Sequence, residues 1–364
     1  MGQRRSAASV VDVAGEGAGW VASKTRRRRG GAMLASAALL ASAALLLPLV
    51  AVAGTASEPA AAGGTVVVYR TPASHALPAN IAVAPGGDLW FTEFATGAVV
   101  RMTPAGSMKS FRVGPAAMGI VHGPEGVMWV SAAADLFGVS SSGRVRTIAD
   151  PDRSVTFTGP NDIGFSGKDS LYVTGINATG RYVVDRVVTT TGTLTTVASF
   201  PSGEELQSLA AGPRCGVWVA ISRTSASGSL CPPLLDRLTQ SGVAKTIPLR
   251  RSDTPNGMVC GPGGALWVAD GASLLRVARD GRKLRRFPLL LPSFSSFVSA
   301  TAVAVSPHGD VWFVGDDGVL GERSPRGTFS YWRIPAGASG GLAVDGVHGV
   351  FTLNETRSEI VVLR

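Results

Sequence analysis

The chain has 364 residues, of which 45% are apolar and 16% are charged, and it contains 46 glycines and 22 prolines. This composition supports a sizeable core and excludes a largely disordered protein. The net charge of +9 does not indicate nucleic-acid binding, because residues 1–53 alone hold seven Lys or Arg against two Asp or Glu, and the remaining excess is scattered.

The first 53 residues have the pattern of an export signal. Four arginines at 26–29 precede an apolar run over residues 32–52, which ends in the sequence Ala51-Val52-Ala53. Signal peptidases accept such small residues, so we predict cleavage near Ala53 and a secreted or cell-envelope protein. An uncleaved membrane anchor is the alternative, because the run is close to the ~20 residues that span a bilayer. Residues 54–63 are predicted to form a flexible leader.

Seven copies of one phrase follow in residues 64–364. The clearest copy is Ile81-Ala-Val-Ala-Pro-Gly-Gly-Asp-Leu-Trp90-Phe-Thr-Glu93, in which an apolar strand, a Pro/Gly turn and a second strand with an aromatic residue succeed one another. Successive aromatics are 39 to 49 residues apart, which is the spacing of propeller blades. They are Trp90, Trp129, Tyr172, Trp218, Trp267, Trp312 and Phe351.

The last copy is one strand short, since only residues 358–364 remain for a third strand. The apolar stretch 64–69 at the other end can supply the missing outer strand. We therefore predict an all-β fold, a seven-bladed β-propeller of four-stranded antiparallel blades over residues 64–364. Its N-terminal strand would close the ring and hide both sheet edges. We expect a monomer.

Three cysteines lie in a chain that is expected to reach an oxidising compartment. Cys215 occupies the turn of the fourth copy, and Cys260 ends the matching strand of the fifth copy near the same face. Cys231 should begin a strand at the other face. This placement favours the pair Cys215–Cys260 over Cys215–Cys231.

The repeat also places polar residues on one face. Residues beside each first strand and three past each aromatic meet at one end of the ring, the loop face, while the Pro/Gly turns lie at the other end, the turn face. Glu93 and Glu355 are neighbours there with Asn80 between them, and such oxygen ligands suit a hard cation such as Mg²⁺. Alternatively, Glu93 and Asp270 are ordinary rim acids that pair with arginines. The predicted ligand-face residues are Asn80, Asn161, Gln207, Asn256 and Asp270.

The blade phrase Gly-Pro-x-Gly-x-(Leu/Met)-Trp-(Phe/Val) resembles the streptogramin B lyase family, also called virginiamycin B lyases, over residues 64–364. The best copy is residues 86–93 with residues 100–106 after it. The resemblance implies a magnesium-assisted elimination that opens the ester of a cyclic depsipeptide, with a histidine as base and acidic side chains around the metal. Propellers that only bind share the same phrase.

The histidines fit that activity poorly. His308 and His348 fall in Pro/Gly turns, so we expect solvated side chains on the turn face, and His122 aligns with inner-strand core or channel positions. His75, in the loop before the first blade, can reach the loop face and is the candidate base. Most other copies lack the acid that corresponds to Glu93.

We therefore predict an exported propeller that binds a small-molecule or peptide ligand, or an envelope partner, on its loop face, and leave open whether it is an enzyme. The alternative is a magnesium-dependent carbon–oxygen lyase of the streptogramin type, and a weaker one is a lactone hydrolase similar to gluconolactonase. A basic cluster in the fifth blade predicts either a solvated face or attraction to an anionic envelope polymer. Its members are Arg279, Arg282, Lys283, Arg285 and Arg286.

Overall fold

The structure, a computed structural model, describes residues 63–149, 155–157, 163–289, 298–315, 318–338 and 340–364. The predicted export signal, nearly all of the leader, and Asn161 lie outside these residues. Within them, no helix is long and apolar enough to cross a membrane. The helices that the structure describes are two single turns, η1 (Pro124–Gly126) and η2 (Pro262–Gly264).

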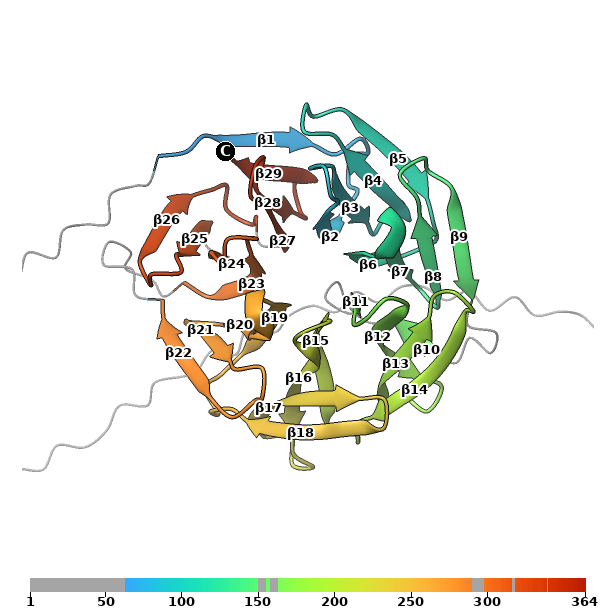
Figure 1. Cartoon of the computed structure of the whole chain (residues 1–364), viewed down its shortest axis with the longest axis vertical. Helices are drawn as coiled ribbons and strands as arrows, with labels where there is room; N and C mark the ends of the chain where they lie inside the picture. The colour runs from blue at the N-terminus through green and yellow to red at the C-terminus, as the bar shows by residue number, and fades with distance from the viewer. Residues whose placement is uncertain (1–62, 150–154, 158–162, 290–297, 316–317, 339) are drawn as a thin grey trace, which may run out of the picture. The chain divides into compact units, whose positions relative to one another are not determined.

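Seven antiparallel sheets stand around a central axis, which confirms the predicted seven-bladed propeller (Figure 1). Blade 1 is β2 (Pro78–Val83), β3 (Leu89–Glu93), β4 (Ala98–Met102) and β5 (Met108–Arg112). Blade 2 is β6 (Ala117–His122), β7 (Met128–Ala132), β8 (Asp135–Val139) and β9 (Val145–Ala149). Blade 3 has a divided inner strand, β10 (Val155–Phe157) and β11 (Ile163–Phe165), followed by β12 (Ser170–Asn177), β13 (Tyr182–Val188) and β14 (Thr193–Ser199). Blade 4 is β15 (Glu204–Gly212), β16 (Gly216–Thr224), β17 (Leu230–Thr239) and β18 (Gly242–Pro248).

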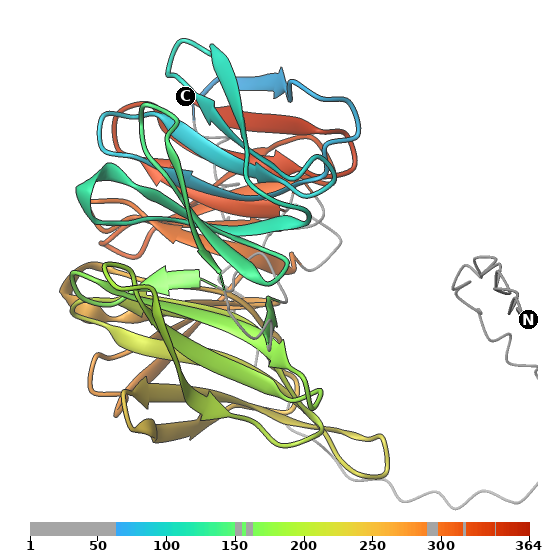
Figure 2. The same cartoon turned by 90° about the vertical axis from the view of Figure 1, so that its right-hand side faces the viewer.

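The remaining blades close the ring. Blade 5 is β19 (Pro255–Cys260), β20 (Leu266–Asp270), β21 (Ser273–Val277) and β22 (Leu284–Pro288), and blade 6 is β23 (Ala300–Val305), β24 (Val311–Gly315), β25 (Val319–Arg323) and β26 (Phe329–Arg333). Blade 7 contains β27 (Gly340–Asp345), β28 (Gly349–Asn354) and β29 (Glu359–Leu363), with β1 (Val66–Arg70) outside β29. The antiparallel register from Val66–Leu363 to Arg70–Glu359 confirms closure by the N-terminal strand, which lies beside the last blade in Figure 2.

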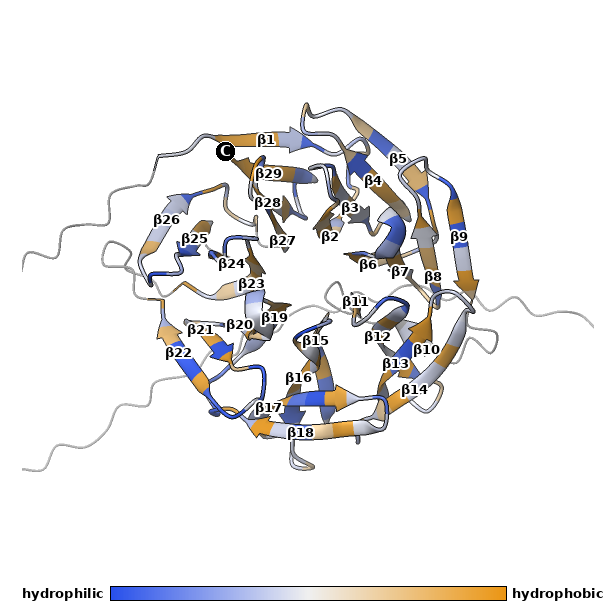
Figure 3. Cartoon of the chain, viewed as in Figure 1, coloured by the Kyte–Doolittle hydropathy of each residue, from blue (hydrophilic) through white to orange (hydrophobic). Residues whose placement is uncertain are grey.

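The seven key aromatics all lie on the second strand of their blades, and their rings pack into the next blade. Trp90 belongs to the apolar cluster of blade 2, Trp218 to that of blade 5, and Phe351 to that of blade 1. The core is therefore a ring of blade-to-blade contacts in which each large flat side chain fills a wedge. The outer strands alternate between apolar and polar residues, as expected for sheets with one solvated side (Figure 3).

Cross-links and close approaches also join neighbouring blades. The structure links Cys215 and Cys260 by a disulfide with Cα atoms 5.7 Å apart, which ties the turn of blade 4 to β19 of blade 5. Cys231 is a free, half-buried thiol. Gly87, in the first turn of blade 1, has a φ of 86°, and a Cβ atom there would collide with the ring of His348 from blade 7.

Candidate functional site

Glu93 does not reach into solvent at the channel mouth. It ends the fully buried strand β3, and only 1% of its surface is exposed. Its Oε2 accepts a hydrogen bond of 2.7 Å from the Thr96 hydroxyl, while its Oε1 is buried without a hydrogen-bond partner in the described residues. Burial raises the pKa of Glu93, and the Thr96 hydrogen bond opposes this shift.

The other members of the predicted metal site are placed differently. Glu355 is exposed in the loop between β28 and β29. Asn80 is buried, and its Oδ1 accepts a hydrogen bond of 2.7 Å from the backbone N–H of Ile81. Within the part of the chain that the structure describes, no three His, Cys, Asp or Glu side chains are close enough to hold a metal ion. Glu93, Asn80 and Glu355, as they are placed, do not form a magnesium site.

Replacing Glu93 with glutamine is expected to make the protein more stable than wild type at neutral pH. Because burial raises the pKa of Glu93 above its ordinary value of 4.5, the folded protein binds this proton more tightly than the unfolded chain. The free energy of unfolding of the wild type should therefore fall as pH rises from the pKa of Glu93 in the unfolded chain to its higher pKa in the folded protein. Glu93→Gln should lack this pH dependence. Urea unfolding of both proteins between pH 4 and pH 8 measures the difference. A wild-type-specific stabilisation by Mg²⁺ would instead make Glu93 a metal ligand.

Asp270 is held in a buried ion-pair network. Arg286 donates from Nη1 to Asp270 Oδ2 and from Nη2 to Asp253 Oδ2, each at 2.6 Å. Asp270 also accepts hydrogen bonds from the Thr254 backbone at 2.7 Å and from the Ser273 hydroxyl at 3.0 Å. Burial, and then the Asp253 carboxylate, raises the pKa of Asp270. These contacts indicate a structural role for Asp270, as in the alternative in which it pairs with an arginine.

Gln207 and Asn256 do come together on the loop face. They line a pocket of about 240 Å³ between blades 4 and 5, which we call the loop-face pocket. The Gln207 amide donates to Ser222 Oγ at 2.8 Å, and the Asn256 amide donates to the Ala300 carbonyl at 3.0 Å. Leu230, which is 71% exposed, adds an apolar edge.

The candidate base is isolated. His75 is exposed in the loop between β1 and β2 and has a left-handed backbone with φ of 57°. Its ring forms no hydrogen bond or ion pair with any residue that the structure describes. His122 is half-buried at the end of β6, and burial lowers its pKa. Neither histidine is oriented by a carboxylate of the described residues, which a general base at the loop face would need.

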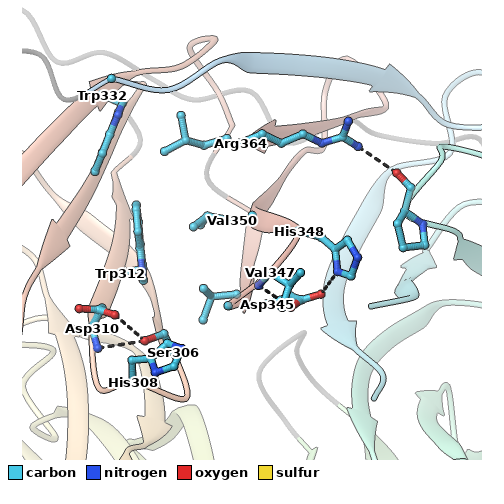
Figure 4. A pocket seen from close by; sticks show the side chains of 16 residues that line it. Ser306, His308, Asp310, Trp312, Trp332, Asp345, Val347, His348, Val350 and Arg364 are labelled. Carbon is cyan, nitrogen blue, oxygen red and sulfur yellow. Dashed lines mark hydrogen bonds and ion pairs between the residues drawn. The ribbon is translucent and has the colours of Figure 1, made fainter. Parts of the chain in front are cut away.

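A cavity larger than the loop-face pocket lies on the turn face, between blades 6 and 7 (Figure 4). This turn-face cavity has a volume of about 530 Å³. One wall carries Trp312 and Trp332, whose rings stack with centroids 5.1 Å apart. Val350 and Val347 lie on the opposite wall. A volume of this size and a largely apolar lining are typical of ligand pockets.

Polar groups lie at both sides of this cavity. On blade 7, His348 Nδ1 is 2.5 Å from Asp345 Oδ2, and Asp345 Oδ1 accepts from the Val347 backbone at 2.9 Å. Burial raises the pKa of Asp345, but the hydrogen bonds from His348 and from the Val347 backbone, together with the charge of His348, outweigh burial and lower the pKa overall. On blade 6, the Ser306 hydroxyl donates to Asp310 at 2.8 Å, beside the exposed ring of His308. The cavity therefore offers an acid-oriented imidazole, carboxylates and two indole faces.

His308 and His348 both lie on the turn face, as the sequence predicts, but only one of them has the predicted solvated side chain. His308 is exposed, whereas His348 is only partly exposed and paired with Asp345. A signal was present, because the turns of two successive blades each carry a histidine and an aspartate, in Pro-His-Gly-Asp and Asp-Gly-Val-His. The repeat alignment concealed it, since the two turns are far apart in sequence and meet only in the ring.

Solved propellers with this fold include streptogramin lyases. Virginiamycin B lyase from Staphylococcus aureus matches with a TM-score of 0.62 and 17% identity, over 83% of this chain and 99% of that chain. A streptogramin B lyase matches with a TM-score of 0.63 and 17% identity, over 83% and 98%. The structure of YCF48 bound to D1 peptide matches with a TM-score of 0.59 and 15% identity, over 84% of this chain and 99% of that chain. These identities show a shared fold. No family model and no curated protein matches the chain.

Proposed function

We propose that this chain is an exported binding propeller whose ligand occupies the turn-face cavity. The observation that carries the proposal is the cavity itself, about 530 Å³ between blades 6 and 7, with a stacked tryptophan pair facing a paired histidine and aspartate. A mostly apolar cavity of this volume with a few converging polar groups is the usual form of a small-ligand site.

The chemistry of the walls favours a peptide-like ligand. Stacked indoles at Trp312 and Trp332 suit an aromatic or proline ring, and the valines opposite them suit aliphatic side chains. Asp310 supplies a hydrogen-bond acceptor, and the imidazole of His348 supplies a second hydrogen-bonding group, for amide N–H and C=O groups. A peptide or depsipeptide offers all of these in a compact form. That YCF48 was solved with a bound peptide supports the proposal in general terms.

The loop face provides the second candidate. Gln207 and Asn256 share the loop-face pocket, and streptogramin lyases have the same fold. The corresponding function is a magnesium-dependent opening of a cyclic depsipeptide ester with His75 as base, or, less strongly, lactone hydrolysis. Both require catalytic groups to gather at a face where Glu93 is buried and Asp270 is ion-paired.

Three exposed aliphatic side chains allow a matched test. Val347 lies at the turn-face cavity, Leu230 at the loop-face pocket, and Val243 on β18 away from both. Each is replaced by tryptophan, and each protein is titrated with a streptogramin B-type cyclic depsipeptide by calorimetry. We expect Val347→Trp to weaken binding by roughly tenfold or more, because a bulky ring blocks the cavity. Leu230→Trp and Val243→Trp should bind like wild type.

The other outcomes separate the candidates. Weakening by Leu230→Trp alone would move the ligand to the loop face. Mass spectrometry of the same mixtures, with Mg²⁺ or EDTA, detects chemistry: a ring-opened product of unchanged mass that is lost with EDTA and in His75→Ala establishes the lyase. A product heavier by one water indicates the hydrolase. Failure of wild type to bind or convert the depsipeptide contradicts this ligand class.

A further inference from the structure

Another hollow on the turn face brings three arginines together against two aromatic rings. This arginine pocket has a volume of about 300 Å³, lies between blades 5 and 6, and is lined by Arg276, Arg285 and Arg323 together with Trp267 and Phe287. Arg276 and Arg285 come from adjacent strands of blade 5, while Arg323 ends β25 of blade 6. The pocket thus depends on the junction of two blades.

The charges in the arginine pocket are not compensated within the described chain. Arg276 and Arg285 are directly opposite each other on β21 and β22, an arrangement that is unfavourable for like charges. No carboxylate lines the pocket, and the ion pairs of the described residues include none of the three arginines. Burial, and then the charge of Arg276, lowers the pKa of Arg323. The arrangement carries a cost that an external anion would remove.

The aromatic rings hold the guanidinium groups in place. The guanidinium carbon of Arg323 is 4.1 Å from the centre of the Phe287 ring and 5.8 Å from that of Trp267. The guanidinium carbon of Arg276 is 5.9 Å from the centre of the Trp267 ring, and the ring centres of Trp267 and Phe287 are 5.6 Å apart. A guanidinium that stacks on an aromatic face keeps its N–H edge available for hydrogen bonds. Arg323 Nε is buried without a partner in the described residues.

In blade 1, the arginine equivalent to Arg276 is neutralised by an acidic side chain. There Arg101 is opposite Trp90, as Arg276 is opposite Trp267, but its guanidinium pairs with Asp88 at 2.6 Å. Asp88 stands two residues before its tryptophan, and the corresponding residue of blade 5 is Ala265. The repeat therefore supplies an acid for the arginine in one blade and omits it in the other.

We infer that the arginine pocket binds a phosphate group. Guanidinium groups recognise the oxygens of phosphate through paired, charge-assisted hydrogen bonds, and three of them more than neutralise its charge of about −2 at neutral pH. The volume exceeds that of a phosphate ion, which leaves room for an organic part against Trp267 and Phe287. Exposed Arg279, Arg282 and Lys283 in the turn of the same hairpin extend the positive surface toward further phosphates. This inference does not depend on the proposed function.

The test is a calorimetric titration of the full chain at low ionic strength. The probes are inorganic phosphate, glycerol phosphate and poly(glycerol phosphate), with chloride at matched ionic strength as the blank. We expect one phosphate group per pocket, and binding weakened by roughly tenfold or more in Arg276→Gln and Arg323→Gln. Arg101→Gln, the same substitution at the neutralised position of blade 1, should bind like wild type. Binding of inorganic phosphate identifies a free ligand, and binding of the polymer alone identifies a phosphate chain.

A second pair of variants protects the test against misfolding. Ala265→Asp supplies the acid that blade 1 has, so it should pair with Arg276 and abolish phosphate binding while all three arginines remain. Ala265 is buried, so circular dichroism must confirm that this variant folds. If it does not, Arg285→Gln replaces an exposed side chain and should still weaken binding. The inference is wrong if wild type binds none of the probes, or binds them no better than Arg276→Gln and Arg323→Gln.

Discussion

Replacement of Arg286 by methionine is expected to destabilise the protein by about 3–5 kcal/mol, the usual cost of removing one partner from a buried ion pair. Arg286 lies between Asp253 and Asp270, whose side chains are only 3% and 1% exposed. Without the guanidinium, two carboxylates remain close together in a region of low polarity. Urea unfolding at pH 7 measures the change in the free energy of unfolding.

Arg101→Met is the matched control for this prediction. Its ion pair with Asp88 is similarly short but 31% and 22% exposed, so we expect a loss of about 1 kcal/mol or less. The loss in Arg286→Met should shrink as pH falls, because the unpaired carboxylates, whose folded pKa values would be raised, can then be protonated. Equal losses in the two variants, or a loss that does not depend on pH, would refute a buried network.

Replacement of Trp218 by alanine is expected to cost about 3–5 kcal/mol, the range for large-to-small changes at buried aromatic positions. Trp218 is fully buried and packs in the apolar cluster of blade 5, and its indole N–H donates to the Cys215 carbonyl at 3.1 Å. The substitution empties the wedge between blades 4 and 5, which the neighbouring strands cannot close without moving.

Trp312→Ala is the control, because this aromatic has the same position in blade 6 but faces the turn-face cavity and is only half-buried. Trp312→Ala should lower the free energy of unfolding by distinctly less than Trp218→Ala does. Thermal and urea unfolding of both variants, with intact disulfides, gives the comparison. If Trp312→Ala destabilises as much as Trp218→Ala, the aromatics serve the fold equally and the cavity next to Trp312 is not a separate feature.

The amino-acid sequence is sufficient to predict the architecture of this protein. Seven phrases with an aromatic every 39 to 49 residues can bury those aromatics only by stacking blades, and the blade that lacks a strand must borrow it from residues 64–69. It also favoured Cys215 and Cys260 as partners, because their turn and strand positions are nearly equivalent in adjacent blades. These features follow from periodicity and from local strand and turn chemistry.

Which polar side chains are free to bind a ligand depends on contacts within and between blades. Asp270 and Glu93 occupy equivalent positions in their blades, yet Asp270 is neutralised by Arg286, whereas Glu93 bonds to Thr96. The turn-face cavity joins His308 of one blade to His348 of the next, and the arginine pocket joins Arg276 to Arg323. The repeat predicts each residue's position along its strand and the face of the ring on which it lies. Many of the side chains that it contacts, however, come from neighbouring blades some 40 residues away in the sequence. Burial and pairing, which set the charge and reactivity of each side chain, therefore arise only when the ring is closed.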